Sequence, residues 1–309
     1  MRSRPSTNLQ TTLAAAVTLE GVGAHSGRPA RIVLSPGDAG SGVVFSRGGR
    51  ASAVDASIAA LARNVSSTDL SVRIGAGEGS VATIEHLMAA LNGLGVDNAV
   101  VDIDGPEVPA MDGSAAAFVA AIDEAGVVPL PAPRRAILLR APVRVCDGAA
   151  WAELAPAPAG GFHMDVEISF PGAPIGRMRR RLSLTPARFR AELARARTFG
   201  FLGDAERLWR SGLALGASLD NTVVIAEERI LNPEGLRFAD EFVRHKMLDV
   251  LGDLALAGAP IIGAFRSYRG GHRLNLALLE TLLATPGAYE IVGAAEQSAR
   301  PTARVGAGR

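Results

Sequence analysis

The spacing of apolar residues along this chain predicts two successive series of strands and helices. Short stretches in which apolar residues alternate or run together, many of them β-branched, are typical of strands. Such stretches lie at 12–22, 30–34, 64–74, 96–103, 136–145, 150–154, 163–170 and 221–226. Apolar residues three and four positions apart predict helices at 84–92, 114–124, 186–196 and 240–257. Each half of the chain thus has strands and then helices, which favours an α+β fold.

Several of the predicted helices begin and end at residues that commonly terminate helices. We expect Thr83 to cap the helix at 84–92, and Thr185, followed by Pro186, to cap the helix at 186–196. Asp240 is the expected cap of the helix at 240–257, and Gly258 is expected to end it.

Prolines and a change of composition divide the chain. Pro129, Pro131 and Pro133 stand at alternate positions, and proline interrupts regular structure. We therefore expect a flexible N-terminus at 1–9, a first domain at 10–128, a linker at 129–134, a second domain at 135–285 and a loose tail at 286–309.

The helix expected at 240–257 is apolar nearly all round, with one short polar line. Its apolar side is formed by Val243, Met247, Val250, Leu251 and Leu254. His245, Asp249 and Asp253 follow one another at one-turn spacing, so they line up on the opposite side. Apolar residues flank this line, which is typical of a buried helix, and buried carboxylates need a cation or hydrogen-bond partners. The alternative is a polar line that faces solvent or forms a helix-surface ion pair.

Composition limits the chemistry that this chain can carry. Its 309 residues have a net charge of +1, so nothing indicates a nucleic-acid partner. Cys146 is the only cysteine, which excludes an internal disulfide and leaves His, Asp and Glu as metal ligands. No apolar run has the length of a membrane span, and the first residues lack the pattern of a signal peptide. We expect a cytoplasmic monomer without a membrane anchor.

Two of the predicted helices supply residues for a metal site. His245 and Asp249 have the one-turn spacing of zinc ligands. With His86 as a third ligand, water would take the fourth tetrahedral position, which is the arrangement of catalytic zinc. Glu85, next to a ligand, would be placed to take a proton from that water. The alternatives are a carboxylate that only stabilises a helix N-terminus and an imidazole with ordinary partners.

Other residues are candidates for the chemistry around such a site. His272 follows two glycines, in an expected flexible loop that can carry its side chain towards a substrate. Asp253 would hold that imidazole and favour its cationic form, which can protonate a leaving amine. Thr198 would donate its hydroxyl to an oxyanion, and Lys246 would neutralise the oxyanion or a phosphate.

His25 lies in a glycine-rich loop at 21–27. The glycine spacing does not match a dinucleotide-binding fingerprint, and no helix is expected to follow. A structural role and a functional role are both open for His25.

Longer motifs occur in a fixed order along the chain. They are 84–91 (IEHLMAAL), 93–98 (GLGVDN), 105–114 (GPEVPAMDGS), 197–201 (RTFGF), 235–238 (GLRF), and Gly271-His272 with Leu274-Asn275 after it. Together they resemble the bacterial UDP-3-O-acyl-N-acetylglucosamine deacetylase family, over roughly residues 9–285. Their length and order make this resemblance far more specific than one His-x-x-x-Asp spacing.

The resemblance implies a fold and a reaction. We expect two similar α+β domains, each with helices packed against β-sheets, and an active site between them. The expected reaction is hydrolysis of the acetamide of UDP-3-O-acyl-N-acetylglucosamine, which releases acetate during lipid A biosynthesis in a Gram-negative bacterium. The expected cofactor is zinc, and iron(II) can also fill sites with N and O donors.

The resemblance also implies roles for individual residues. The zinc ligands would be His86, His245 and Asp249. Glu85 would be the general base, and His272, supported by Asp253, the acid or an electrostatic partner. Thr198 and Lys246 would lie near the oxyanion and the substrate. The expected substrate-binding residues are Phe199 beside the glucosamine, Phe170 at the uracil, Arg269 at the phosphates, Leu208 in an apolar acyl-chain passage formed by an insert near 197–215, and His25.

Two other functions are compatible with these residues. One is a metal-dependent amidohydrolase that acts on a different acylated sugar nucleotide. The other is a binding protein in which the metal only joins the domains, which would fold normally and show no turnover.

Overall fold

The computed structural model describes residues 9–48 and 57–293. Its helices are α1 (Glu85–Leu94), α2 (Ala116–Ala125), α3 (Pro186–Arg188), α4 (Ala205–Arg210), α5 (Glu241–Ala255) and α6 (His272–Ala284). Its strands are β1 (Leu9–Leu13), β2 (Val17–Val22), β3 (Pro29–Pro36), β4 (Val43–Arg47), β5 (Ser57–Ala59), β6 (Val65–Ser67), β7 (Arg73–Ile74), β8 (Val81–Ala82), β9 (Ala99–Ile103), β10 (Val127–Pro133), β11 (Arg135–Leu139), β12 (Val143–Asp147), β13 (Ala150–Ala155), β14 (Phe162–Phe170), β15 (Gly176–Ser183), β16 (Phe199–Phe201), β17 (Val223–Ala226), β18 (Arg229–Ile230), β19 (Ile261–Tyr268) and β20 (Tyr289–Gly293). This is a mixed α+β fold, as predicted.

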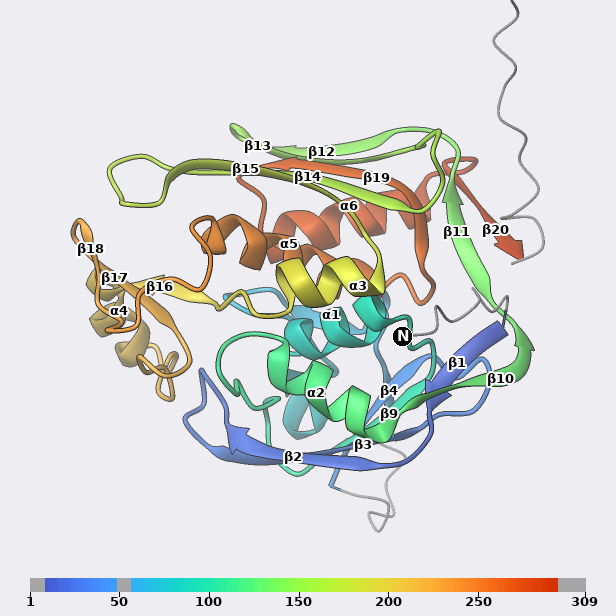
Figure 1. Cartoon of the computed structure of the whole chain (residues 1–309), viewed down its shortest axis with the longest axis horizontal. Coiled ribbons are helices and arrows are strands. Elements are labelled where there is room, and N and C mark those ends of the chain that lie inside the picture. The colour runs from blue at the N-terminus through green and yellow to red at the C-terminus, as the bar shows by residue number, and fades with distance from the viewer. Residues whose placement is uncertain (1–8, 49–56, 294–309) are drawn as a thin grey trace, which may run out of the picture.

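The main helices lie between two sheets (Figure 1). On one side is the sheet with strand order β2-β3-β9-β4-β5, next to α1 and α2. On the other side, a larger sheet follows the order β12-β13-β19-β11-β20, and β14 joins β19 to β15. This sheet packs against α5 and α6. In the middle α1 packs directly against α5, so the two halves of the chain meet along these helices.

Alternating patterns decide which face of each strand is covered. In β3, Ala30, Ile32 and Leu34 are buried, whereas the residues between them are more exposed. In β19, Phe265 and Ser267 are buried, and Arg266 between them is exposed. Each sheet therefore turns its apolar face to the helices.

The outer face of the larger sheet carries a row of alternating charges. Arg144 pairs with Glu153, which also pairs with Arg266, and Arg266 pairs with Asp165, which pairs with Arg181. Opposite charges in directly facing positions stabilise neighbouring strands. The row therefore helps to fix the register of the strands that lie over α5 and α6.

Helix α5 is buried nearly all round, as its sequence predicts. His245, Asp249 and Asp253 are each 2% exposed, so the polar line does not face solvent and is not a surface ion pair. At Gly252 the helix approaches α1 so closely that a Cβ atom would overlap the backbone carbonyl of Glu85. The absence of a side chain at this position permits the contact between the helices.

The segment expected to be a linker is mostly a strand. Residues 127–133 form β10, which pairs antiparallel with β1 in a two-stranded sheet. Proline cannot donate a hydrogen bond, but prolines at alternate positions place their missing N–H groups along one edge of the strand. A two-stranded sheet leaves such an edge unpaired. The proline signal therefore indicated an edge strand instead of an irregular connection.

The chain also stays ordered beyond the expected end of the second domain. Residues 289–293 form β20, which pairs antiparallel with β11, so the expectation of a loose tail from 286 is wrong up to 293. Residues 1–8 and 294–309 lie outside the described residues, and the division into two domains stays a prediction. No helix within 9–48 or 57–293 combines the length and apolar content needed to cross a bilayer.

The ends of the helices are partly as predicted. Thr185 accepts a hydrogen bond from the backbone N–H of Arg188 at 3.1 Å, as a cap does. Asp240 is at the N-cap position of α5, but its side chain pairs with Arg180 and Arg244 instead of capping the helix. The N-cap of α1 is Ile84, and Thr83 does not cap.

Several other elements differ from those predicted. The stretch 12–22 contains the end of β1 and all of β2, and 64–74 contains β6 and β7, because turns interrupt both stretches. The strands β15 and β19 and the helix α6 were not predicted. His272 is the first residue of α6 and not part of a flexible loop. The preceding glycines therefore mark the start of a helix.

Candidate active site

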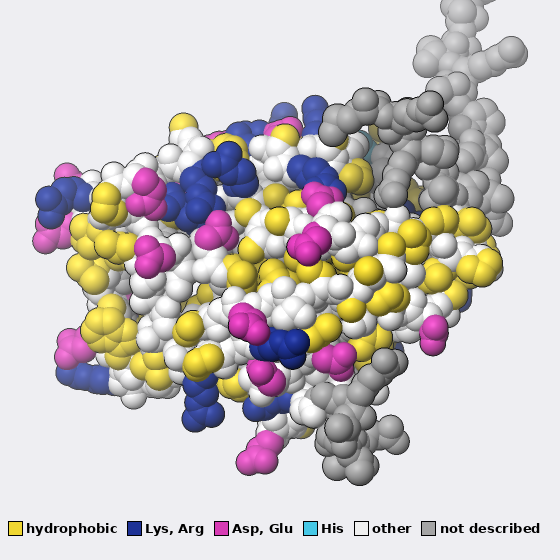
Figure 2. Space-filling view, turned by 60° about the horizontal axis from the view of Figure 1, so that its bottom comes forward, with side chains coloured by type: hydrophobic (Ala, Val, Ile, Leu, Met, Phe, Trp, Pro, Cys, Tyr) yellow, Lys and Arg dark blue, Asp and Glu magenta, His cyan; other side chains and the backbone are white. Residues whose placement is uncertain are grey.

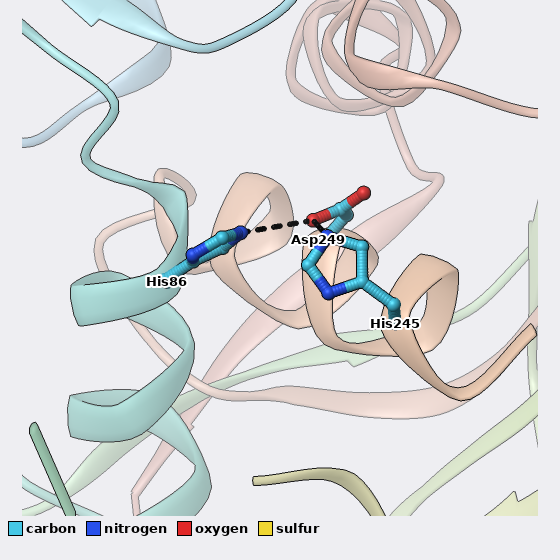
Figure 3. Close-up of side chains that lie close together, drawn as sticks. All are labelled: His86, His245 and Asp249. Carbon is cyan, nitrogen blue, oxygen red and sulfur yellow. Dashed lines mark ion pairs between the residues drawn. The ribbon is translucent and has the colours of Figure 1, made fainter. Parts of the chain in front are cut away.

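Three ligand-type side chains meet where α1 packs against α5 (Figure 3). His86 lies in the first turn of α1, and His245 and Asp249 lie one turn apart on α5. Oδ1 of Asp249 is 3.3 Å from Nε2 of His245 and 3.7 Å from Nε2 of His86. All three residues are buried, and one potential ligand atom from each lies within 4.8 Å of the others. The fold thus brings together the side chains that were predicted to bind a metal.

Hydrogen bonding leaves two lone pairs facing each other in this cluster. Nδ1 of His245 donates to the carbonyl of Ala196 at 3.0 Å, because a carbonyl only accepts. Burial lowers the pKa of His245 to about 4, so the ring is neutral and Nε2 carries a lone pair. Oδ1 of Asp249 is buried without a hydrogen-bond partner among the described residues. A cation between these two atoms would satisfy both of them.

The donor set and its dimensions fit a zinc ion. Zinc bonds to imidazole nitrogen and carboxylate oxygen are about 2.0–2.2 Å long, so the donors of a tetrahedral site lie roughly 3.3 Å apart. The distances of 3.3 and 3.7 Å from Asp249 to the two imidazoles are close to this value. Three protein ligands leave one tetrahedral position for water or substrate, and the same donors also suit iron(II).

Lys246 holds the second oxygen of Asp249. Its Nζ donates to Oδ2 at 2.8 Å. Burial alone would raise the pKa of Asp249, but His245 and Lys246 outweigh burial and hold it well below the usual range. Nζ of Lys246 also lies 5.4 Å from the ring centre of Phe199, within reach of a cation–π contact. Lys246 and Phe199 therefore flank the cluster on one side.

Glu85 stands beside the cluster with one oxygen directed towards a histidine. Its Oε2 accepts a hydrogen bond from the backbone N–H of Val72 at 3.0 Å. Its Oε1 lies 3.8 Å from Nε2 of His272. Burial raises the pKa of Glu85, against the effect of the neighbouring His272 and His86. A carboxyl with a raised pKa is suited to exchange a proton near neutral pH.

Asp253 holds His272 on the other side. Nδ1 of His272 donates to the Asp253 carboxylate, with both oxygens at 2.9 Å. The Asp253 carboxylate also accepts from Nδ2 of Asn275 at 2.8 Å. Burial alone would lower the pKa of His272, but Asp253 and, after it, Glu85 and Asp249 raise it to about 10. The imidazole is therefore a cation at neutral pH, with Nε2 directed towards Glu85.

Comparison with known proteins shows to which family this chain belongs. The sequence model of the UDP-3-O-acyl N-acetylglycosamine deacetylases matches residues 10–284. This chain belongs to that deacetylase family. The UDP-3-O-acyl-N-acetylglucosamine deacetylases of Brucella ovis, Brucella abortus (strain 2308) and Brucella melitensis biotype 2 are each 50% identical to it over 286 residues, which is 92% of this chain and 99% of each relative. The resemblance that the sequence motifs indicated is confirmed.

Two of the substrate-binding residues predicted from the family lie close together. The rings of Phe170 and Phe199 pack edge to face at 5.9 Å between centres, and Phe199 lies 6.3 Å from the His245 ring. Thr198 precedes Phe199, and its backbone bonds to Gly113 and Val223. The Thr198 hydroxyl makes no hydrogen bond with any described residue. An aromatic wall therefore leads from the cluster to Phe170.

The other substrate-binding residues predicted from the family are more dispersed. Burial lowers the pKa of His25, against the effect of the neighbouring Glu107. The backbone N–H of His25 donates to the Glu107 carboxylate. Leu208 belongs to α4, which has no buried residue. Arg269 is exposed after β19, and its backbone N–H donates to the carbonyl of Glu167. No described contact joins Leu208 or Arg269 to the cluster.

Two supporting groups of this family member were not predicted. Asn275 orients Asp253. Its position three residues after His272 on the same helix could have indicated this contact from the sequence. Arg197 is 1% exposed and binds Glu241 through its side chain and its backbone N–H. This contact fixes the segment whose Ala196 carbonyl orients His245. Every residue has a backbone carbonyl, so the sequence cannot indicate that the carbonyl of Ala196 binds His245. Only the structure shows this contact.

Proposed function

We propose that this chain is a zinc-dependent deacetylase of lipid A biosynthesis, which hydrolyses the N-acetyl group of UDP-3-O-acyl-N-acetylglucosamine and releases acetate. Membership of the family supports the reaction. The observation that carries the proposal is the unpartnered Oδ1 of Asp249, which faces Nε2 of His245 beside Glu85 and His272. This combination provides a cation site, a base and an acid in one buried place.

In this proposal His86, His245 and Asp249 hold the zinc ion. A zinc ion lowers the pKa of a bound water from about 15.7 towards 7 and polarises a carbonyl. The hydrogen bond of His245 to Ala196 keeps its other nitrogen available as a ligand. Lys246 keeps the Asp249 carboxylate ionised. Iron(II) is compatible with the same donors.

Glu85 acts as the general base of the proposed reaction. Its carboxylate accepts a proton from the attacking water while the oxygen of that water bonds to the acetamide carbon. The backbone N–H of Val72 holds one carboxylate oxygen, which leaves the other for this proton. The nearby cationic His272 lowers the pKa of Glu85 and so opposes the effect of burial.

His272 acts as the general acid. Breaking the bond between the acetamide carbon and nitrogen requires a proton on the leaving amine, and the imidazolium supplies it from Nε2. Asp253 accepts from Nδ1, so it keeps the ring oriented and charged. Thr198 and Lys246 are proposed to stabilise the negative oxygen that develops on the acetamide carbonyl.

The remaining residues are proposed to bind the substrate. Phe199 would lie beside the glucosamine, Phe170 at the uracil, Arg269 at the phosphates, Leu208 along the acyl chain, and His25 near the sugar. The contact between the rings of Phe170 and Phe199 supports a continuous aromatic surface for sugar and base. We further propose that the enzyme acts as a monomer in the cytoplasm.

Acetate release from UDP-3-O-acyl-N-acetylglucosamine tests the proposed function. Purified protein is assayed as isolated, after chelation and after return of zinc, with Glu85→Ala alongside. We expect turnover that chelation abolishes and zinc restores, and loss of turnover in Glu85→Ala while zinc stays bound. The variant thus distinguishes the loss of the base from the loss of the metal as the cause of lost turnover.

No turnover by folded, zinc-loaded wild-type protein would contradict the proposal. Other acylated sugar nucleotides would then be the next substrates to assay. Turnover of an N-acetyl sugar nucleotide without the 3-O-acyl chain at the same rate would contradict the proposed acyl-chain site and favour the alternative, a metal-dependent hydrolase with a different substrate.

A further inference from the structure

Thr83 has a backbone conformation that is unusual for its residue type. Its φ is +57°, in the left-handed region, which β-branched side chains rarely adopt. Thr83 is buried and directly precedes Ile84, the N-cap of α1. Its conformation therefore sets the direction in which the chain enters the helix that carries Glu85 and His86. Conformations of this kind persist only where surrounding contacts hold them.

The side-chain contact that holds Thr83 is made by Glu107. Oγ1 of Thr83 donates to Oε1 of Glu107 at 2.8 Å. The backbones around both residues are joined as well, because Ala82 donates to the carbonyl of Pro106 and Val108 donates to the carbonyl of Ala82, both at 3.0 Å. Glu107 is buried, so its carboxylate is fixed relative to Thr83.

The same carboxylate binds the loop that contains His25. It accepts hydrogen bonds from the backbone N–H groups of His25 at 3.0 Å and Ser26 at 2.8 Å. Burial alone would raise the pKa of Glu107, but these donors and Thr83 hold it below its usual value. A Cβ atom at Gly23 would overlap the carboxylate, so glycine is needed for this close approach.

Neutral hydrogen-bond donors, and not a cation, stabilise this carboxylate. Glu107 forms no ion pair with an arginine or lysine of residues 9–48 and 57–293. The ionised acceptor is therefore used to join three separate segments: the His25 loop, the turn at Thr83, and the loop of Glu107 itself. Two of these segments carry residues of the candidate active site.

We propose that Glu107 is a positioning residue, which holds Thr83 in the left-handed conformation and thereby aims the first turn of α1 so that Glu85 and His86 meet His245 and Asp249. This role presupposes the proposed function of those residues. Neither Glu107 nor Thr83 is proposed to touch the substrate or the metal. Their effect should appear in zinc affinity and in kcat more than in KM.

Substitutions at Thr83 distinguish the contribution of its hydroxyl from that of its backbone conformation. Thr83→Ser keeps the hydroxyl, Thr83→Val keeps the shape without it, and Thr83→Gly adopts the left-handed conformation without help. We expect Thr83→Val to weaken zinc binding and lower kcat by about 10- to 100-fold each, because small displacements of catalytic groups have effects of this size. Thr83→Ser should restore most of both, and Thr83→Gly should retain more of both than Thr83→Val.

Glu107→Gln tests whether the Glu107 carboxylate is needed as a hydrogen-bond acceptor. Glutamine has the same shape, but its amide nitrogen cannot accept a hydrogen bond from a backbone N–H. We expect it to weaken zinc binding and lower kcat in wild type, and to cost much less in the Thr83→Val background, where the contact is already lost. Glu227→Gly is the matched control for Thr83→Gly, because Glu227 also has a positive φ, of 50°, on an exposed turn. It should leave zinc affinity unchanged.

Zinc affinity is measured by competition with a chelator, kcat and KM by acetate release, and folding by circular dichroism. Wild-type zinc affinity and turnover in Thr83→Val and Glu107→Gln would overturn the proposal, and so would additive effects in the double variant. If Glu107→Gln does not fold, the series at Thr83 decides the question alone. If wild type binds zinc without turnover, the proposed function fails, while the zinc affinities still test Glu107.

Discussion

The contact between α1 and α5 and the exposed part of the expected insert, residues 202–215, represent opposite extremes of packing in one chain. At the contact, Gly252 lets the helices approach until backbone meets backbone, and His86, His245 and Asp249 are buried. In the insert, α4 has no buried residue. Three of the insert's large apolar side chains, Leu202, Trp209 and Leu215, are exposed, whereas Leu208 and Leu213 are half-buried. Hydrophobic side chains are visible at the end of the molecule where the insert lies (Figures 1 and 2).

This difference separates two tasks of the proposed enzyme. The groups for the chemistry are fixed by packing before a substrate arrives, as a preorganised site requires. Several large apolar side chains of the insert are exposed, and exposed apolar groups that gather in one place are typical of binding surfaces. We therefore expect changes at the helix contact to affect kcat and zinc binding, and changes in the insert to affect KM for acylated substrate.

The largest expected effect comes from Asp253→Asn. Loss of the Asp253 charge lowers the pKa of His272, so less of the imidazole is charged at neutral pH. We therefore expect kcat to fall by about 100-fold or more, which is the size of effect that general acid catalysis has. The alkaline limit of activity should also move to lower pH, because Asp253 is the main cause that raises the pKa of His272. A pH–rate profile measures both. An unchanged alkaline limit would show that His272 does not supply the proton.

The same pair makes a pH-dependent contribution to stability. The pKa of His272 is raised from 6.5 to about 10 in the folded protein. Its contribution is therefore complete below pH 6.5 and is lost as the pH rises through about 10. Urea unfolding of the metal-free protein should show wild type more stable than Asp253→Asn at neutral pH, with a smaller difference at high pH. A constant difference would contradict the charged pair.

Gly252→Ala should have the next largest effect. The added methyl group would overlap the carbonyl of Glu85 and force α1 and α5 apart. Overpacking of this kind costs about 1–3 kcal/mol of stability, and a displacement of about 1 Å can lower kcat by about 100-fold. Gly203→Ala in the insert is the matched control, because nothing lies within 4 Å of its added Cβ. Denaturant unfolding and kcat are measured for both, and equal effects would contradict the comparison.

Substitutions in the insert should have smaller and more selective effects. Leu208→Ala and Trp209→Ala should raise KM for acylated substrate by up to about tenfold, from lost apolar contact. They should leave kcat and the KM for a substrate without the acyl chain unchanged. Arg210→Ala is the control, because its exposed ion pair with Glu206 contributes little. Loss of kcat in the leucine or tryptophan variant would show that the insert also supports the chemistry.

The sequence predicted those parts of the site that depend on local periodicity. The line of His245, Asp249 and Asp253 follows from helical spacing alone, and its burial follows from the apolar residues around it. The pairing of Glu85 and His86 with that line came from chemistry and from the family motifs. Spacing alone does not show which distant helix packs against α5.

The features that were missed depend on tertiary context. The prolines of β10 were interpreted as part of an irregular linker. They lie at the unpaired edge of a strand whose partner, β1, is more than a hundred residues away in the sequence, so the local pattern could not show this edge. The glycines before His272 read as a flexible loop, although they precede a helix held by Asp253. Thr83 read as a helix cap, but its hydroxyl binds Glu107. Each error used a correct local preference that a distant contact overrode.

Zinc binding by wild type and by Asp249→Asn tests the central claim most directly. Both proteins are stripped of metal and titrated with zinc against a chromophoric chelator. We predict one tight zinc site per chain in wild type, and an affinity weaker by about 100-fold or more in the variant, because an amide is a poorer ligand than the carboxylate that faces His245. Equal affinities in the two folded proteins, or no zinc binding by wild type, would contradict the account.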